Sequence, residues 1–242
     1  MIKAVLFDMD GVLFDSMPVH AQAWQETMEK YISGSKAEDY YLFEGRTGFS
    51  TINILFNKHL GRSASDEEVQ HIYAQKSRRF AELDNASPMQ GALAVLEKVK
   101  SLGLQALIVT GSGQLSLFEK IEQYFPGHFN PEQMVTAFDV EHGKPHPEPY
   151  LIGLEKADVS ASEAIVVENA PLGIESAVAA GIYTIAVNTG PLPDHILSDA
   201  GANALYPSMQ ALADDIENRV DILAHPRVSP DYGNGVFIEK SK

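Results

Sequence analysis

Four short, largely apolar runs are the sequence feature that most restricts how this chain can fold. They occupy residues 4–7, 104–109, 164–167 and 184–187. None of them alternates between apolar and polar residues, so each is typical of a strand that is covered on both faces in a parallel sheet. A fifth, shorter strand is expected at residues 204–206.

Helix-like stretches lie between these predicted strands. Residues 91–102 carry Leu93, Leu96, Val99 and Leu102 at three-residue steps, which is typical of a helix. Strand and helix therefore alternate along the chain. This order predicts an α/β fold with an open, doubly wound parallel sheet.

Residues 16–85 interrupt the alternation, because they follow the first strand and contain no convincing strand of their own. We expect three helices there, at residues 18–31, 49–60 and 65–83. The last of them begins with a capping-box pattern from Ser65 to Glu68. The predicted organisation is an α/β core made of residues 1–15 and 86–242, with residues 16–85 inserted as a helical cap.

The composition excludes several classes of function. The 18 Lys and Arg against 33 Asp and Glu leave a net charge of −15, which makes nucleic acid and anionic membranes poor partners. Cysteine is absent, so disulfides, thiolate nucleophiles, zinc–thiolate sites and iron–sulfur sites are excluded. No apolar run approaches the roughly 20 residues that span a bilayer, and the first strand begins too early to leave room for a secretory signal. We expect a cytoplasmic monomer that acts on a small molecule.

Two carboxylates, Asp8 and Asp10, follow the first predicted strand. At positions i and i+2 of an extended chain they point the same way, at the strand end where open α/β sheets place their ligands. Two adjacent anions are costly unless a cation is shared between them, and Mg²⁺ suits oxygen donors of this kind. The alternative is a surface pair that merely ends the strand.

Further polar clusters favour a functional interpretation. Thr110 and Gly111 follow the second predicted strand and can direct an O–H group and N–H groups at a phosphoryl oxygen. Lys144 precedes a predicted helix, as a point charge that can bridge a carboxylate and a phosphate. Glu168 and Asn169 end the next strand with oxygen donors of the metal-ligand type.

The segments DMDG, VTGSG, GKP and VEN, in this order, resemble the four signature motifs of the haloacid dehalogenase superfamily. The helical insertion resembles the small cap of its β-phosphoglucomutase-like branch. The resemblance implies a Rossmann-like core in which Asp8 is the nucleophile that becomes an aspartyl phosphate, and Asp10 is the general acid and base.

The same resemblance implies the remaining roles. The side chains of Asp8 and Asn169 and the carbonyl of Asp10 would hold Mg²⁺, with Glu168 as a ligand or as the partner of one. The transferring phosphoryl group would be bound by four residues: Thr110, Gly111, Ser112 and Lys144.

The cap loop departs from the pattern of β-phosphoglucomutase. Glu44 stands where we expect a phosphate-binding lysine, and Phe49 where we expect an arginine. Asn169 replaces an aspartate that many relatives carry, so Glu44 could restore the missing charge by joining the Mg²⁺ ligands when the cap closes. This combination resembles a branch that hydrolyses inorganic pyrophosphate, with Arg46 and Lys76 holding the leaving phosphate. Alternatively, Glu44 is a solvated carboxylate that pairs with Arg46.

Other functions stay open on the sequence alone. His20 matches a histidine near the hinge of β-phosphoglucomutase and is a candidate substrate-binding residue, so interconversion of β-glucose 1-phosphate and glucose 6-phosphate is an alternative. A phosphatase acting broadly on small phosphomonoesters is another. A sensor that binds a phosphorylated ligand without turnover is disfavoured, because Asp8 and Lys144 are both present.

Overall fold

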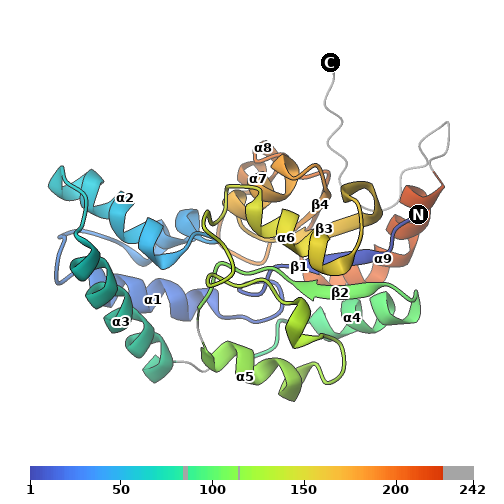
Figure 1. Cartoon of the computed structure of the whole chain (residues 1–242), viewed down its shortest axis with the longest axis horizontal. Coiled ribbons are helices and arrows are strands. Elements are labelled where there is room, and N and C mark those ends of the chain that lie inside the picture. Colours follow the sequence, from blue (N-terminus) through green and yellow to red (C-terminus); the bar gives the residue numbers. More distant parts are fainter. Residues whose placement is uncertain (84–86, 114, 226–242) are drawn as a thin grey trace.

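Five parallel strands form the centre of the computed structural model, which describes residues 1–83, 87–113 and 115–225 (Figure 1). The strands are β1 (Ala4–Phe7), β2 (Gln105–Ile108), β3 (Ala164–Glu168), β4 (Tyr183–Val187) and β5 (Ala204–Tyr206). They lie in the order β2-β1-β3-β4-β5. The predicted α/β fold with an open parallel sheet is confirmed, and each strand begins and ends within one residue of its expected position.

Successive residues of β1 face opposite sides of the sheet, and both sides are buried. Val5 and Phe7 share one apolar cluster with residues of three helices of the core and with Val19, Ala23 and Phe80 of the inserted segment, and Ala4 and Leu6 share another with residues of two helices. The first set comprises α4 (Ala92–Ser101), α5 (Leu115–Tyr124) and α9 (Met209–Ala224), and the second α6 (Glu148–Ala157) and α7 (Pro171–Ala179). A further helix, α8 (Asp194–Asp199), packs beside β4 through Leu197.

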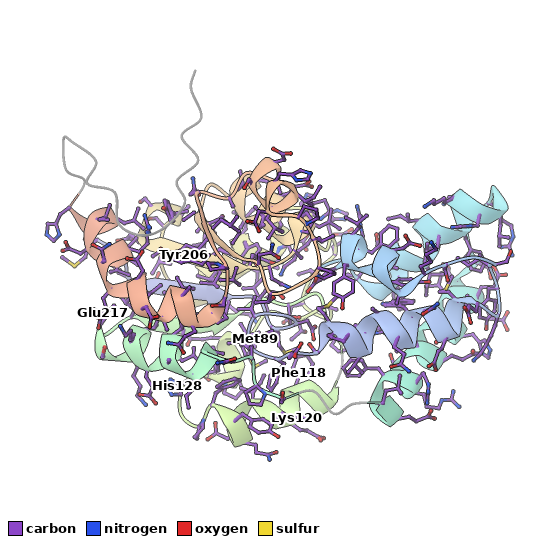
Figure 2. The ribbon with its side chains drawn as sticks, turned by 180° about the vertical axis from the view of Figure 1, so that it is seen from behind. Met89, Phe118, Lys120, His128, Tyr206 and Glu217 are labelled. Atoms are coloured by element: carbon purple, nitrogen blue, oxygen red, sulfur yellow. The ribbon has the colours of Figure 1, made fainter. Side chains whose placement is uncertain are left out.

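Figure 2 shows the α4 and α9 face from behind. Glu217 of α9 is labelled there, and its carboxylate lies 3.4 Å from the ammonium of Lys98 on α4. The predicted helix at residues 91–102 is confirmed as α4, but not all of its leucines are buried. Leu93 is 45% exposed and Leu102, just after the helix, is 38% exposed. The face that packs on the sheet consists of Ala92, Val95, Leu96 and Val99. A three-residue step drifts off one face of a helix with 3.6 residues per turn, so only part of the pattern stays buried.

The inserted segment is helical, as predicted. It contains α1 (Met17–Met28), a 3₁₀ helix η1 (Ala37–Phe43), α2 (Gly48–Leu60) and α3 (Asp66–Leu83). These helices enclose an apolar cluster of their own, around Trp24, Met28 and Phe56. The capping box at α3 is confirmed, because the Ser65 N–H donates to the Glu68 carboxylate at 2.8 Å and the Glu68 N–H donates to Ser65 Oγ at 3.2 Å.

Two predictions fall outside the described residues. They are the cap boundary at residues 85 and 86 and the peripheral tail after Pro226. Two short 3₁₀ helices complete the described elements, η2 (Pro131–Gln133) and η3 (Ala161–Glu163). Within the described ranges, no helix is both long and apolar enough to cross a membrane.

The strand order places the site. Because β1 lies between β2 and β3, the residues that follow these three parallel strands meet at one edge of the sheet. Asp8 follows β1, Thr110 follows β2, and Glu168 ends β3. The helices of the cap lie over this edge (Figure 1).

Candidate active site

Lys144 lies at the centre of the site, in the loop that precedes α6. Its ammonium donates to Asp8 Oδ1 at 2.6 Å, to Glu168 Oε1 at 2.6 Å and to the carbonyl of Val109 at 3.0 Å. Its side chain is completely buried. Burial lowers the pKa of a lysine, but the charges of Asp8 and Glu168 outweigh this effect and hold the pKa of Lys144 above its usual value. The lysine is therefore a fixed positive charge beside Asp8.

Glu168 holds this lysine in place. Its Oε1 also accepts a hydrogen bond from the hydroxyl of Tyr150 at 2.8 Å. Its Oε2 accepts from the N–H groups of Asn169 at 3.0 Å and Ala170 at 3.1 Å. Both oxygens are thus occupied, and the geometry favours a supporting role for Glu168 over direct binding of a metal.

Asp8 sits in a crowded anionic environment. Burial raises its pKa to about 8; Lys144 acts in the opposite direction, and the nearby charges of Glu168 and Asp10 add to the rise. A cation beside Asp8 would stabilise its ionised form.

Asp10 is held by the first helix of the cap. Its Oδ1 accepts from Ser16 Oγ at 2.5 Å and lies 3.0 Å from His20 Nε2. Burial alone would raise the pKa of Asp10, but the interactions with His20 and Ser16 lower it below its usual value. In the free protein Asp10 is therefore ionised at neutral pH.

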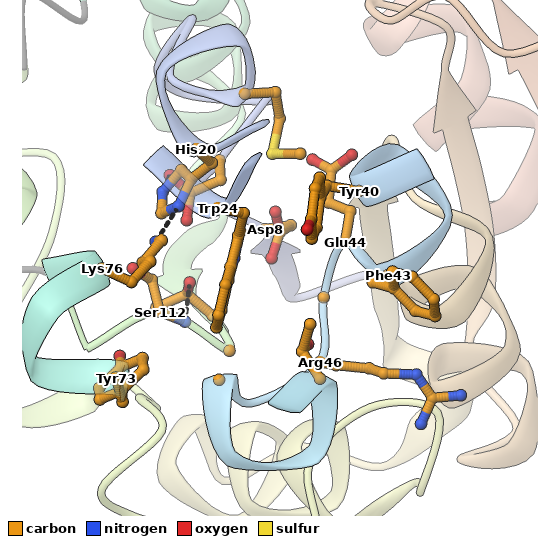
Figure 3. A pocket seen from close by; sticks show the side chains of 17 residues that line it. Asp8, His20, Trp24, Tyr40, Phe43, Glu44, Arg46, Tyr73, Lys76 and Ser112 are labelled. Atoms are coloured by element: carbon orange, nitrogen blue, oxygen red, sulfur yellow. Dashed lines mark hydrogen bonds and ion pairs between the residues drawn. The ribbon is translucent and has the colours of Figure 1, made fainter. Parts of the chain in front are cut away.

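His20 connects Asp10 to α3. The ammonium of Lys76 lies 2.6 Å from His20 Nδ1, and Figure 3 marks this contact with a dashed line. If Lys76 donates to Nδ1, the proton of His20 is on Nε2 and is donated to Asp10. Burial lowers the pKa of Lys76 to about 7, although the charge of Asp10 acts in the opposite direction. Lys76 borders the cavity, but its ammonium is engaged with His20, so a role in binding a leaving phosphate stays a prediction.

Glu44 comes from the loop between η1 and α2 and is buried against the core. Its Oε1 accepts from Asn169 Nδ2 at 2.7 Å. Burial raises the pKa of Glu44 well above its usual value; the bond from Asn169 acts in the opposite direction, and nearby carboxylates add to the rise. Glu44 is 8% exposed and bonds to Asn169, whereas Arg46 bonds to Ser50, so the alternative of a solvated Glu44 paired with Arg46 does not describe its position.

The residues present fit Mg²⁺. Asn169 Oδ1 is buried without a hydrogen-bond partner, beside the carboxylates of Asp8 and Glu44. No group of three or more His, Asp or Glu side chains within the described ranges is arranged for a metal ion. The amide oxygen of Asn169 and the main-chain carbonyl of Asp10 are oxygen ligands of the kind that Mg²⁺ accepts.

A small cavity separates the cap from these groups. Its volume is about 60 Å³, below the roughly 300–1,000 Å³ of common small-molecule sites. The polar side of its lining includes Asp8, Asp10, Thr110, Gly111 and Ser112. The cap side is largely aromatic, with Trp24, Tyr40, Phe43 and Tyr73.

The structure brings most of the predicted phosphate-binding residues to the cavity wall. Thr110 Oγ1 accepts from the Ser112 N–H at 2.9 Å, which shapes the loop after β2. Arg46 also lines the cavity, but Figure 3 shows its guanidinium turned away from Asp8, and its Nη1 donates to Ser50 Oγ at 3.4 Å. Phe49 is 49% exposed and lies edge-on to Tyr73 on the cap, with ring centres 5.3 Å apart.

Two supporting residues were missed by the sequence analysis. Ser16 could have been found as the N-cap of the helix that begins at Met17, although its hydroxyl bonds to Asp10 instead of capping that helix. Tyr150 offers no comparable signal, because a tyrosine in the first turn of a helix is most often a packing residue.

Comparison with known proteins agrees with this geometry. The family described as "Haloacid dehalogenase-like hydrolase" matches residues 5–187. Hexitol phosphatase A of Escherichia coli (strain K12) is 34% identical over 191 residues, which cover 77% of this chain and 83% of that relative. The phosphorylated carbohydrates phosphatase of Thermotoga maritima is 31% identical over 217 residues, covering 87% of this chain and 97% of the relative.

One solved structure is more similar in sequence. It is described as "Putative beta-phosphoglucomutase from Bacteroides vulgatus" and is 51% identical, with a TM-score of 0.88. The match covers 92% of this chain and 90% of that chain. Its cap and core therefore correspond to those of this protein over almost their whole length.

Proposed function

The chain belongs to the haloacid dehalogenase-like hydrolases, and from this premise we propose that it is a Mg²⁺-dependent phosphohydrolase that works through an aspartyl phosphate on Asp8. The observation that carries the proposal is the pair of 2.6 Å contacts that place the Lys144 ammonium between Asp8 and Glu168. A fixed cation beside a buried carboxylate positions a nucleophile and neutralises phosphoryl charge, which are the main needs of phosphoryl transfer.

In the first step, a carboxylate oxygen of Asp8 forms a bond to phosphorus while the bond from phosphorus to the leaving oxygen breaks. Asp10 donates a proton to that oxygen, and the anionic substrate beside it raises the pKa of Asp10 enough to supply its acid form. In the second step, ionised Asp10 takes a proton from water, and the water oxygen forms a bond to phosphorus. The bond between phosphorus and the Asp8 oxygen breaks, which restores the Asp8 carboxylate and releases inorganic phosphate.

The remaining residues bind and orient. Thr110, Gly111 and Ser112 border the cavity beside Asp8 and supply hydrogen-bond donors for the phosphoryl oxygens. Asp8, Asn169 Oδ1 and the Asp10 carbonyl would hold Mg²⁺, with Glu44 as a further ligand when the cap is closed. Mg²⁺ bound there neutralises charge on the phosphoryl group.

Inorganic pyrophosphate is the substrate that the site geometry favours. Glu44 is buried beside Asn169 at the position where a lysine would bind the distal phosphate of a sugar bisphosphate, so this position offers no cation for that phosphate. The cavity of about 60 Å³ also favours a very small substrate.

A phosphorylated sugar or polyol is the second candidate, and the comparisons favour it over pyrophosphate. The relatives from Escherichia coli and Thermotoga maritima are named as phosphatases of a hexitol phosphate and of phosphorylated carbohydrates. The aromatic side chains on the cap side of the cavity are also compatible with a carbon skeleton. Mutase activity on β-glucose 1-phosphate is supported by the description of the solved Bacteroides vulgatus chain.

A phosphate-release screen with Mg²⁺ separates these candidates. The substrates are pyrophosphate, a hexitol phosphate, glycerol 1-phosphate and an acyl phosphate, with a coupled glucose 6-phosphate assay for mutase activity. We expect the highest kcat/KM with pyrophosphate. A large advantage for the hexitol phosphate would reject pyrophosphate as the substrate and leave the phosphohydrolase assignment intact.

A further inference from the structure

The cap loop approaches the core closely at three glycines, of which Gly45 belongs to the loop and Gly111 and Gly143 to the core; at the two core glycines a Cβ would lie below 3.0 Å from the loop. A Cβ added to Gly111 would lie 2.4 Å from the carbonyl oxygen of Gly45, and one added to Gly143 would lie 2.7 Å from Thr47 Cγ2. A Cβ on Gly45 would lie 3.3 Å from Lys144 Cδ. We call Gly45, Gly111 and Gly143 the glycine seat.

Thr47 connects the glycine seat to the cap. Its Oγ1 accepts from the Ser50 N–H at 3.3 Å and so caps the start of α2. Its methyl carbon, Cγ2, is the part that faces Gly143. The two halves of one side chain therefore have separate partners: the hydroxyl holds the helix, and the methyl contacts the core.

We propose that Gly143 is a specificity-determining residue, because its lack of a side chain lets the cap loop seat deeply enough to bring Glu44 against Asn169. A Cβ placed 2.7 Å from Thr47 Cγ2 requires a shift. Rotation of the Thr47 side chain would relieve the contact only by moving Oγ1 away from the Ser50 N–H that it caps, so we infer that the cap loop lifts instead. Thr47 and Glu44 are three residues apart on the same loop, so lifting Thr47 also lifts Glu44. The cavity then becomes larger and loses a carboxylate. This inference rests on the proposed phosphohydrolase function.

Gly143 is the seat position at which this can be tested cleanly. Its φ lies outside the left-handed region, whereas Gly45 has a φ of +86°, so alanine is compatible with the backbone only at Gly143 of these two. Gly111 borders the phosphoryl site and would confound the test.

The experiment compares Gly143→Ala, Thr47→Ser and the double variant. Thr47→Ser removes the methyl that alanine would meet and keeps the capping hydroxyl. Trp24, the single tryptophan of the chain, lines the cavity and is 8% exposed. Quenching of its fluorescence by acrylamide therefore reports cap closure without any substrate. The second readout is the ratio of kcat/KM for pyrophosphate to kcat/KM for a hexitol phosphate.

We expect Gly143→Ala to increase the quenching constant of Trp24 fluorescence severalfold. The ratio of kcat/KM for pyrophosphate to kcat/KM for the hexitol phosphate should fall on the order of tenfold. Thr47→Ser alone should resemble the wild type, and the double variant should recover both values. Unchanged quenching in Gly143→Ala, or no recovery in the double variant, would overturn the proposal; the latter would mean that the alanine acts through its neighbour Lys144.

Two further outcomes are also decisive. If Gly143→Ala does not fold, a folded double variant supports the steric contact and an unfolded one overturns it. If the wild type turns over none of the phosphate compounds, the proposed function fails, while the quenching series still decides whether the glycine seat controls closure.

Discussion

The amide nitrogen of Asn169 lies 2.7 Å from a carboxylate oxygen of Glu44, which is 125 positions away in the sequence. The contact joins the cap loop to the end of β3, next to the carboxylate that we assign as the nucleophile. It leaves Asn169 Oδ1 buried without a partner. One amide therefore bonds to the closed cap through its nitrogen and offers its oxygen to a cation.

Replacing Glu44 with glutamine tests this arrangement. Glu44→Gln keeps the size of the side chain and an acceptor for Asn169 but removes the charge. We expect the rate of pyrophosphate turnover to fall about 10- to 100-fold, because loss of a group that supports a metal typically has an effect of this size. The Mg²⁺ concentration that gives the half-maximal rate should rise. The matched control is Glu67→Gln, at an exposed position of α3. Equal Mg²⁺ titrations of Glu44→Gln and wild type would contradict the ligand role of Glu44.

Asp8→Asn tests the covalent step. We expect the rate of phosphate release to fall on the order of 10⁴-fold or more, because the nucleophile is lost while the surrounding site persists. Beryllium fluoride, which mimics an aspartyl phosphate, should bind to the wild type with Mg²⁺ and fail to bind to the variant. Asp199→Asn, an exposed change on α8, is the control for folding and assay conditions. Undiminished hydrolysis by Asp8→Asn would refute the mechanism.

Tyr150→Phe tests the support of the site behind Lys144. The change removes the hydroxyl that donates to Glu168 at 2.8 Å and keeps the aromatic ring, whose centre is 5.0 Å from the Lys144 ammonium. We expect the free energy of unfolding to fall by about 1–3 kcal/mol, since a buried carboxylate loses a donor. We also expect kcat to fall with little change in KM. Tyr31→Phe, which removes a hydroxyl bonded to Gln75 within the cap, is the comparison.

Lys76→Met tests the buried lysine through the pH dependence of stability. The pKa of Lys76 is lowered to about 7 by burial, against 10.5 as its ordinary value. Between these values the unfolded chain binds a proton at this position that the folded chain does not, so the stability of the wild type rises with pH.

From pH 7 to pH 9, the free energy of unfolding of the wild type should therefore rise relative to that of Lys76→Met by roughly 1 kcal/mol per pH unit. Urea unfolding at several pH values measures it. Lys58→Met, at an exposed position of α2, should show no such trend. Parallel pH profiles for wild type and Lys76→Met would disprove the lowered pKa.

Much of the framework could be predicted because it depends on local patterns. Continuous apolar runs mark strands covered on both faces, and parallel strands bring their carboxyl ends to one edge. These two regularities are enough to place Asp8, Thr110 and Glu168 together. The helical cap and its capping box at Ser65 follow from periodicity and local hydrogen bonding in the same way.

The parts that could not be predicted depend on contacts between distant segments. The occupied oxygens of Glu168, the contact of Lys76 with His20 and the outward turn of Arg46 are set by packing between cap and core. The helix at α4 was predicted, but its buried face was not, because a spacing of three residues does not by itself indicate which side of a helix meets the sheet; Leu93 and Leu102 are partly exposed. The close approach of Thr47 to Gly143 could not be predicted from the GKP motif that contains this glycine, since the two residues lie in segments far apart in the sequence.

The central position of β1 has a consequence for how the molecule moves. Its main chain is hydrogen-bonded to strands on both sides, and the bonding continues beyond it, where the Asp8 N–H donates to Val167. Amide protons in such a strand exchange with solvent only in large, rare openings, whereas much of the apolar packing of the cap lies in a cluster of its own and can open separately. The carboxylate that we propose as the nucleophile therefore directly follows a strand that we expect to exchange slowly, and cap motions that release products can leave that strand undisturbed.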